Sequence, residues 1–226
     1  MTLPRAVKGV VFDMDGLLVE TEVLYRDCMM AAALAMEAEL PFPVFQQMIG
    51  LPYEASDAVA RAHFGPDFDI DVFNEDVSRR VHAGLEAGVA LKAGVLEILD
   101  VLDAQGLPRA IATSSSHNAV LLHLAPSDIL HRFGAVIARG DYERGKPYPD
   151  PYLRAAEAIG IAPENCLALE DSHNGVRAAH AAGMMTVMVP DLLDPTEEMR
   201  TLCVHIADSL HHVIELITAR EAEPRP

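Results

Sequence analysis

The fold of this chain is decided by VKGVVFDMDG, residues 7–16 of 226. Residues 7–12 form a short apolar run with three valines, a pattern typical of a buried strand. Two aspartates, Asp13 and Asp15, follow it directly, and the Asp15-Gly16 pair is a turn signal. The stretch therefore predicts a buried strand that ends in two carboxylates and a turn.

Similar apolar runs recur along the chain and alternate with stretches of helical spacing. The predicted strands are residues 7–12, 109–113, 135–138, 166–169 and 186–189, with a sixth run at 204–207 that closes the fold. The predicted helices that follow them are residues 119–124, 152–159, 174–182 and 209–217. Alternating strands and helices predict an α/β fold, a Rossmann-like parallel sheet covered by helices on both faces.

About 90 residues between the first two predicted strands break this alternation, since they have helical spacing and few strand signals. We predict an inserted α-helical domain at residues 18–87, and a core formed by residues 1–17 and 88–226. Gly16 and Gly88 at its two edges allow the chain to hinge. The tail from residue 220 is predicted to be frayed.

The composition indicates an ordinary globular protein with a strongly negative charge. Half of the residues are hydrophobic, and 17 Lys and Arg against 34 Asp and Glu give a net charge of −17. This charge disfavours nucleic acids and anionic membranes as partners. Three unpaired cysteines in apolar stretches, a start unlike a signal peptide and the lack of a long apolar run predict a cytoplasmic protein. We expect a monomer, with a dimer as the alternative.

Polar clusters follow four of the predicted strands. They are Asp13-Met14-Asp15-Gly16, Thr113-Ser114-Ser115-Ser116, Gly145-Lys146-Pro147 and Glu170-Asp171-Ser172. Because ligands bind beyond the carboxyl ends of parallel strands, we expect all four clusters to meet at one edge of the sheet. Alone, the first cluster is typical of a turn, the last of a helix cap, and Lys146 of a solvated loop lysine. Their joint placement predicts a functional site.

The residue types at this edge indicate phosphate chemistry with a metal ion. Four carboxylates, Asp13, Asp15, Glu170 and Asp171, would repel one another unless a cation lay among them. Their oxygen ligands favour Mg²⁺ over Zn²⁺. Lys146 and a hydroxyl group suit phosphoryl oxygens. An ionised aspartate can attack phosphorus, and a second one nearby can act as acid and base.

The four clusters resemble, in order and spacing, the four motifs of the haloacid-dehalogenase-like superfamily, over essentially the whole chain. The inserted helical domain resembles the cap of the subgroup with β-phosphoglucomutase, phosphoglycolate phosphatase and sugar-phosphate phosphatases. The resemblance implies that Asp13 is the nucleophile that forms an aspartyl phosphate and that Asp15 is the general acid and base. It implies that Ser114 and Lys146 bind phosphate.

The resemblance also implies Mg²⁺ as the cofactor. Its ligands would be Asp13, the backbone carbonyl of Asp15 and Asp171, with Glu170 in support. The dehalogenases of the superfamily lack an aspartate at the position of Asp15, so phosphoryl transfer is favoured. We predict a Mg²⁺-dependent phosphatase that acts on a small phosphomonoester, such as a sugar phosphate.

Several alternatives stay open. A phosphomutase similar to β-phosphoglucomutase would use the same core, and a catalytically silent binding protein would share the fold. Such mutases carry a cap histidine and a cap arginine where this chain has Tyr25 and Tyr53, which favours hydrolysis, with Arg26 as a nearby substitute cation. Thr113 competes with Ser114 for the hydroxyl role.

The substrate itself is not set by the sequence. Cap residues that lie near the predicted site by position are Glu20, Glu22, Tyr25, Arg26, Tyr53 and Glu54. His117 and His173 adjoin the motifs and could touch substrate, but we predict that they are ordinary side chains outside the site. Residues 140–146 match the glycine and lysine spacing of a P-loop, but Pro147 stands where that loop needs Ser or Thr, which excludes it.

Overall fold

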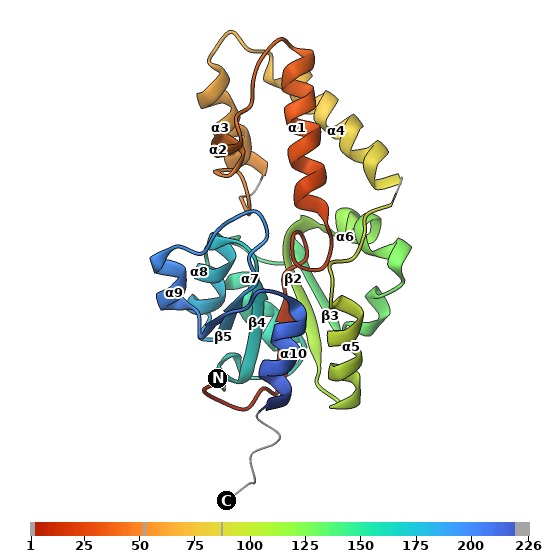
Figure 1. The fold of residues 1–226 in the computed structure, drawn as a ribbon, viewed down its shortest axis with the longest axis vertical. Coiled ribbons are helices and arrows are strands. Elements are labelled where there is room, and N and C mark those ends of the chain that lie inside the picture. The colour runs from red at the N-terminus through yellow and green to blue at the C-terminus, as the bar shows by residue number, and fades with distance from the viewer. Residues whose placement is uncertain (1–2, 52, 87, 220–226) are drawn as a thin grey trace, which may run out of the picture.

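A six-stranded parallel sheet forms the centre of the computed structural model, which describes residues 3–51, 53–86 and 88–219 (Figure 1). Its order is β3-β2-β1-β4-β5-β6. The strands are β1 (Gly9–Phe12), β2 (Arg109–Ser116), β3 (Ala135–Arg139), β4 (Cys166–Glu170), β5 (Met185–Met188) and β6 (His205–Ile206). Each predicted strand overlaps one of these, so the predicted α/β fold with a parallel sheet is confirmed.

Strand β2 differs from its prediction, since it continues three residues beyond 113. The pairing of β2 with β3 shifts between Ala112 and Ser116 and then resumes, with Ser116 opposite Arg139. The serine cluster therefore lies within strand β2 rather than in a loop. This irregularity changes the directions of its side chains, as bulges commonly do.

Helices cover both faces of the sheet. One face carries α5 (Val95–Ala104), α6 (His117–Leu124) and α10 (Leu210–Ala219), which pack on Val10 and Phe12 of β1. The other carries α7 (Asp150–Ala158) and α8 (His173–Ala181), which pack on Val11. Alternate side chains along β1 thus pack into the two apolar cores on opposite faces of the sheet. The chain also contains α9 (Glu197–Leu202) and the 3₁₀ turns η1 (Ala125–Ser127), η2 (Leu130–Arg132) and η3 (Pro163–Asn165).

Four helices between β1 and β2 lie together beyond one end of the sheet (Figure 1). They are α1 (Thr21–Ala35), α2 (Phe42–Phe45), α3 (Tyr53–Phe64) and α4 (Ile70–Glu86), and we call them the helical insert. They share an apolar cluster that includes Phe45 and Phe73, and Leu193 from the segment after β5 packs into it. The domain limits at residues 18–87 stay a prediction, because residue 87 lies outside the described residues, as does the tail from residue 220.

The two segments that join the helical insert to the sheet are paired with each other. The backbone N–H of Glu20 donates to Ala90 O, and that of Lys92 donates to Leu18 O, each at 3.0 Å. The Lys92 ammonium also contacts Glu20 at 3.2 Å and Asp191 at 2.7 Å. The connection is therefore a braced two-stranded link. None of the helices within the described residues is long and apolar enough to cross a membrane.

Phe12 should contribute strongly to the stability of the core. Its ring is fully buried and packs edge to face against Phe133, with 5.7 Å between the ring centroids. We expect Phe12→Ala to lower the free energy of unfolding by about 3–5 kcal/mol in urea denaturation, because the cavity left in the core cannot collapse fully. The control Leu34→Ala removes a side chain that is 75% exposed and should change stability by about 0.5 kcal/mol or less. Equal effects of the two substitutions would contradict the assigned core.

Candidate active site

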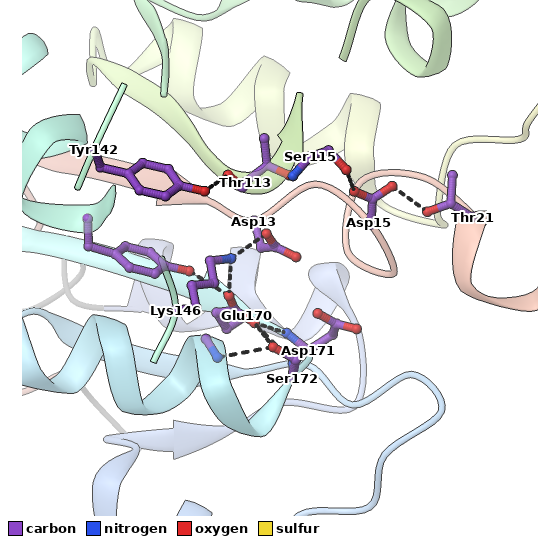
Figure 2. A network of polar contacts seen from close by, with 12 residues as sticks. Asp13, Asp15, Thr21, Thr113, Ser115, Tyr142, Lys146, Glu170, Asp171 and Ser172 are labelled. Atoms are coloured by element: carbon purple, nitrogen blue, oxygen red, sulfur yellow. Dashed lines mark hydrogen bonds and ion pairs between the residues drawn. The ribbon is translucent and has the colours of Figure 1, made fainter. Parts of the chain in front are cut away.

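A buried lysine joins the ends of two strands at the carboxyl edge of the sheet (Figure 2). The Lys146 ammonium donates to Asp13 Oδ1 after β1 and to Glu170 Oε1 at the end of β4, each at 2.5 Å. All three side chains are buried. The third cluster of the sequence is thereby brought onto the first and the fourth.

Glu170 is the most heavily bonded side chain of the site. Its Oε1 accepts from Lys146 and from the Tyr152 hydroxyl at 2.7 Å. Its Oε2 accepts from the backbone N–H of Asp171 and of Ser172, and from the Ser172 hydroxyl, each at 3.0 Å. A Cβ at Gly175 would lie 1.6 Å from Oε1, so only glycine allows the first turn of α8 to pack this closely. These contacts fix Glu170 as a support of the site.

Three carboxylates gather beside this lysine in an arrangement that fits a cation. Ligand oxygens of Asp13, Glu170 and Asp171 lie within 4.8 Å of one another. Asp171 Oδ1 is buried and has no hydrogen-bond partner among the described residues. Since both Glu170 oxygens already accept hydrogen bonds, Asp13 and Asp171 are the side chains best placed to hold a metal ion.

The electrostatics of the group lead to the same conclusion. Burial raises the pKa of Asp13 to about 7, although the neighbouring Lys146 opposes this. Burial, and then the charges of Glu170 and Asp13, raise the pKa of Asp171 well above its ordinary range. A single ammonium therefore does not balance the group. A hard divalent cation would do so, because it prefers oxygen ligands.

The Asp15 side chain points away from the carboxylates of Asp13, Glu170 and Asp171, as Figure 2 shows. Its Oδ1 accepts from Thr21 Oγ1 at 2.8 Å, and its Oδ2 accepts from Ser115 Oγ at 2.7 Å. His123 Nδ1 lies 3.1 Å from Oδ1, outside hydrogen-bond alignment. Burial raises the pKa of Asp15, but His123, Ser115 and Thr21 together outweigh it and lower that pKa. A metal contact from Asp15 would therefore come from its backbone carbonyl.

The two candidate hydroxyl groups differ in their partners. Thr113 Oγ1 accepts from the Ser115 backbone N–H at 3.0 Å. Ser114 Oγ is buried without a hydrogen-bond partner within the described part of the chain, and Ser114 lines the cavity above the site. The Thr113 hydroxyl thus already accepts one hydrogen bond, whereas the Ser114 hydroxyl has both its donor and its acceptor free for a ligand among the described residues.

A cavity of about 480 Å³ separates the sheet edge from the helical insert. Asp13, Ser114, Lys146 and Asp171 line its core side. The side formed by the insert is mostly apolar and includes Met29, Phe45, Met48, Ile49, Phe73, Val77, Val81 and Leu85. The insert closes tightly here, because a Cβ at Gly50 would lie 2.9 Å from the Ser172 side chain. A molecule bound in the cavity therefore contacts polar residues on the core side and mostly apolar residues on the insert side.

The residues proposed from position alone divide into two groups. Glu22, Tyr25 and Tyr53 line the cavity, whereas Glu20, Arg26 and Glu54 are not among its lining residues. The two motif histidines are engaged elsewhere: His117 contacts Asp141 at 2.9 Å, and His173 contacts the Asp194 carbonyl at 2.9 Å.

Sequence reasoning missed the partners of the motif residues, chiefly Thr21, Ser115, His123 and Tyr152. Ser115 belongs to the predicted serine cluster, and this position could have indicated that it takes part in the site. His123 carried no signal, since a histidine in an apolar helix is typical of a core position.

Comparisons with known proteins agree with this geometry. The family model of the haloacid dehalogenase-like hydrolases matches residues 10–189. A Drosophila melanogaster protein named "Probable pseudouridine-5'-phosphatase" is 36% identical over 199 residues, which cover 83% of each chain. Phosphoglycolate phosphatase of Shigella boydii is 32% identical over 204 residues, 80% of each chain.

The fold has close counterparts among solved structures. The crystal structure of a "predicted phosphoglycolate phosphatase" from Haemophilus somnus superimposes with a TM-score of 0.80 at 21% identity and covers 94% of this chain and 99% of its own. At this identity the likeness concerns the fold alone. From the family match over most of its length and from these relatives, the chain belongs to the haloacid dehalogenase-like hydrolases.

Proposed function

We propose that this chain is a Mg²⁺-dependent phosphatase that releases phosphate from a small phosphomonoester through an aspartyl phosphate on Asp13. The observation that carries the proposal is the contact of Lys146 with Asp13 and Glu170 beside the buried Asp171. It combines a nucleophilic carboxylate, a phosphate-binding ammonium and a cation ligand on one cavity floor. Relatives that are named as phosphatases support it.

The donor set suits Mg²⁺, which prefers oxygen ligands and keeps positions for water and phosphate. Asp13, Asp171 and the backbone carbonyl of Asp15 would hold the ion, with Glu170 behind them. When bound, it would neutralise the carboxylates and polarise the phosphoryl oxygens.

In the first step, a carboxylate oxygen of Asp13 forms a bond to phosphorus as the bond to the leaving oxygen breaks. Lys146 holds Asp13 Oδ1 and so orients the carboxylate. Lys146 and the free hydroxyl of Ser114 donate to the phosphoryl oxygens, where negative charge develops. The leaving oxygen takes a proton from Asp15.

In the second step, Asp15 takes a proton from water, which attacks phosphorus and breaks its bond to Asp13. The low pKa of Asp15 before substrate binds suits this base role. A phosphate dianion placed beside Asp15 raises its pKa, which lets it carry the proton for the first step. Hydrogen bonds from Thr21 and Ser115 hold the Asp15 carboxylate in place for both proton transfers.

Hydrolysis is favoured over mutase chemistry. Tyr25 and Tyr53 line the cavity at the positions where the mutases carry basic cap residues, and neither has a positive charge with which the insert could hold a second phosphate. Arg26, the nearby substitute, pairs with Asp27 and is not a lining residue. Three free cysteines support the further proposal of a cytoplasmic location.

The first test is Asp13→Asn, which removes the nucleophile but keeps the side-chain shape. We expect kcat/KM for phosphate release to fall by roughly a thousandfold or more. Asp15→Asn is the matched variant. It should also slow release, yet keep the rise in melting temperature on adding Mg²⁺, since its carboxylate faces Thr21 and Ser115. Equal loss of the Mg²⁺ response in both variants would contradict this division of roles.

A second test uses the stability of the metal-free protein. Burial raises the pKa of Asp13 to about 7 and that of Glu22 to about 8. Both groups titrate near pH 4 when unfolded, so between about pH 4 and 8 the native state binds more protons than the unfolded chain. Stability is therefore present at low pH and is lost as pH rises through this window.

We expect the melting temperature in EDTA to fall between about pH 5 and pH 8, and Mg²⁺ to restore it mainly at the higher pH. Differential scanning fluorimetry with and without Mg²⁺ measures both effects. A melting temperature with the same pH dependence in EDTA and in Mg²⁺ would show that no cation binds among these carboxyl groups.

A further inference from the structure

Arg139 is a cavity residue that the proposed reaction does not use. It is the last residue of β3, it lies opposite Ser116 of β2, and it lines the cavity. Its guanidinium forms neither a hydrogen bond nor an ion pair with the side chains of the described residues, and it is exposed. The five N–H donors of this cavity-lining residue thus have no partner among the described side chains.

The other basic groups of the cavity already have neighbours. Lys146 is bonded to Asp13 and Glu170. His123 lies beside Asp15, and His82 lies 3.4 Å from Glu86. The arginines of the helical insert, Arg26, Arg61, Arg79 and Arg80, all pair with aspartates and are not lining residues. Among the described lining residues, Arg139 is therefore the cation with unused donors.

Arg139 and the serine cluster lie on neighbouring strands and line the same cavity. Adjacent strands lie about 4.8 Å apart, so Arg139 is one strand away from the serine cluster that contains Ser114. It shares this cavity with Tyr25 of α1 in the insert. The transferred phosphoryl group has Lys146 and Ser114 as its own donors. Arg139 is available for another part of the substrate.

We propose that Arg139 selects phosphomonoesters whose leaving group carries a second anionic group, a carboxylate or another phosphate. This inference rests on the proposed phosphatase function. A planar guanidinium binds either anion through two parallel hydrogen bonds, which lysine cannot reproduce. The insert side of the cavity offers such an anion only apolar groups, tyrosines, neutral polar groups, His82 and the acids Glu22 and Asp57 among its described lining residues. Recognition of the anion therefore falls to the core.

Steady-state kinetics of Arg139→Gln and Arg139→Lys test this role. The substrates are 2-phosphoglycolate, which carries a carboxylate, fructose 1,6-bisphosphate, which carries a second phosphate, and glycerol 1-phosphate, whose leaving group is uncharged. We expect Arg139→Gln to lower kcat/KM for at least one of the two doubly anionic esters by about 10- to 100-fold, mainly through KM. For glycerol 1-phosphate the change should stay below about threefold. Arg139→Lys should restore part of the loss.

Arg144→Gln is the matched control, because it removes the same charge from the segment that directly follows β3. Arg144 pairs with Asp150 at 2.9 Å and is not a lining residue, so all three esters should react as with the wild type. Inhibition by inorganic phosphate should be unchanged in Arg139→Gln. The two anionic esters tell a carboxylate site from a second phosphate site.

Two results would overturn the role of Arg139 while leaving the phosphatase in place. One is an equal loss for all three esters together with weaker inhibition by phosphate, which would assign Arg139 to the transferred phosphoryl group. The other is no change for any ester. Absence of phosphate release by the wild type from every ester tested would instead contradict the proposed function, and this inference with it.

Discussion

The whole site depends on one buried ammonium group. Lys146 bonds at once to Asp13 at the end of β1 and to Glu170 at the end of β4, and it is nearly inaccessible to solvent. Burying charges is costly unless they are paired and hydrogen-bonded, and here the pairing is incomplete, because several carboxylates face one lysine. The excess negative charge suits a cation, as the proposed function requires. The same contact fixes Glu170, which in turn sets the start of α8 and requires glycine at position 175.

The separation of two aspartates only two residues apart follows from the same geometry. Asp13 faces Lys146 and belongs to the three carboxylates whose arrangement fits a cation, and burial there raises its pKa. Asp15 faces Thr21, Ser115 and His123, where the surroundings lower its pKa. One environment suits a group that bonds to phosphorus beside a metal ion. The other suits a group that exchanges protons without binding the metal through its side chain.

Much of this arrangement could be predicted from the sequence, for a definite reason. Apolar runs marked the strands, and in a parallel sheet the residues after each strand must meet, so the convergence of Asp13, Ser114, Lys146 and Asp171 followed from chain order. The partners of these residues could not be predicted in the same way. Thr21 and His123 reach Asp15 only through tertiary packing. The difference between Ser114 and Thr113 depends on the irregular pairing of β2 with β3, which extends the strand to Ser116.

The proposed mechanism requires that Asp13 carry the phosphoryl group during turnover. The most direct measurement is rapid acid quenching of the Mg²⁺-loaded enzyme during hydrolysis of a phosphomonoester, followed by peptide mass spectrometry. A phosphoryl group on the peptide that contains Asp13, formed and lost at rates compatible with turnover, is the predicted result. Two results would contradict an aspartyl phosphate on Asp13. One is turnover with the phosphoryl group on another residue, and the other is turnover with no phosphoenzyme and no effect of Asp13→Asn.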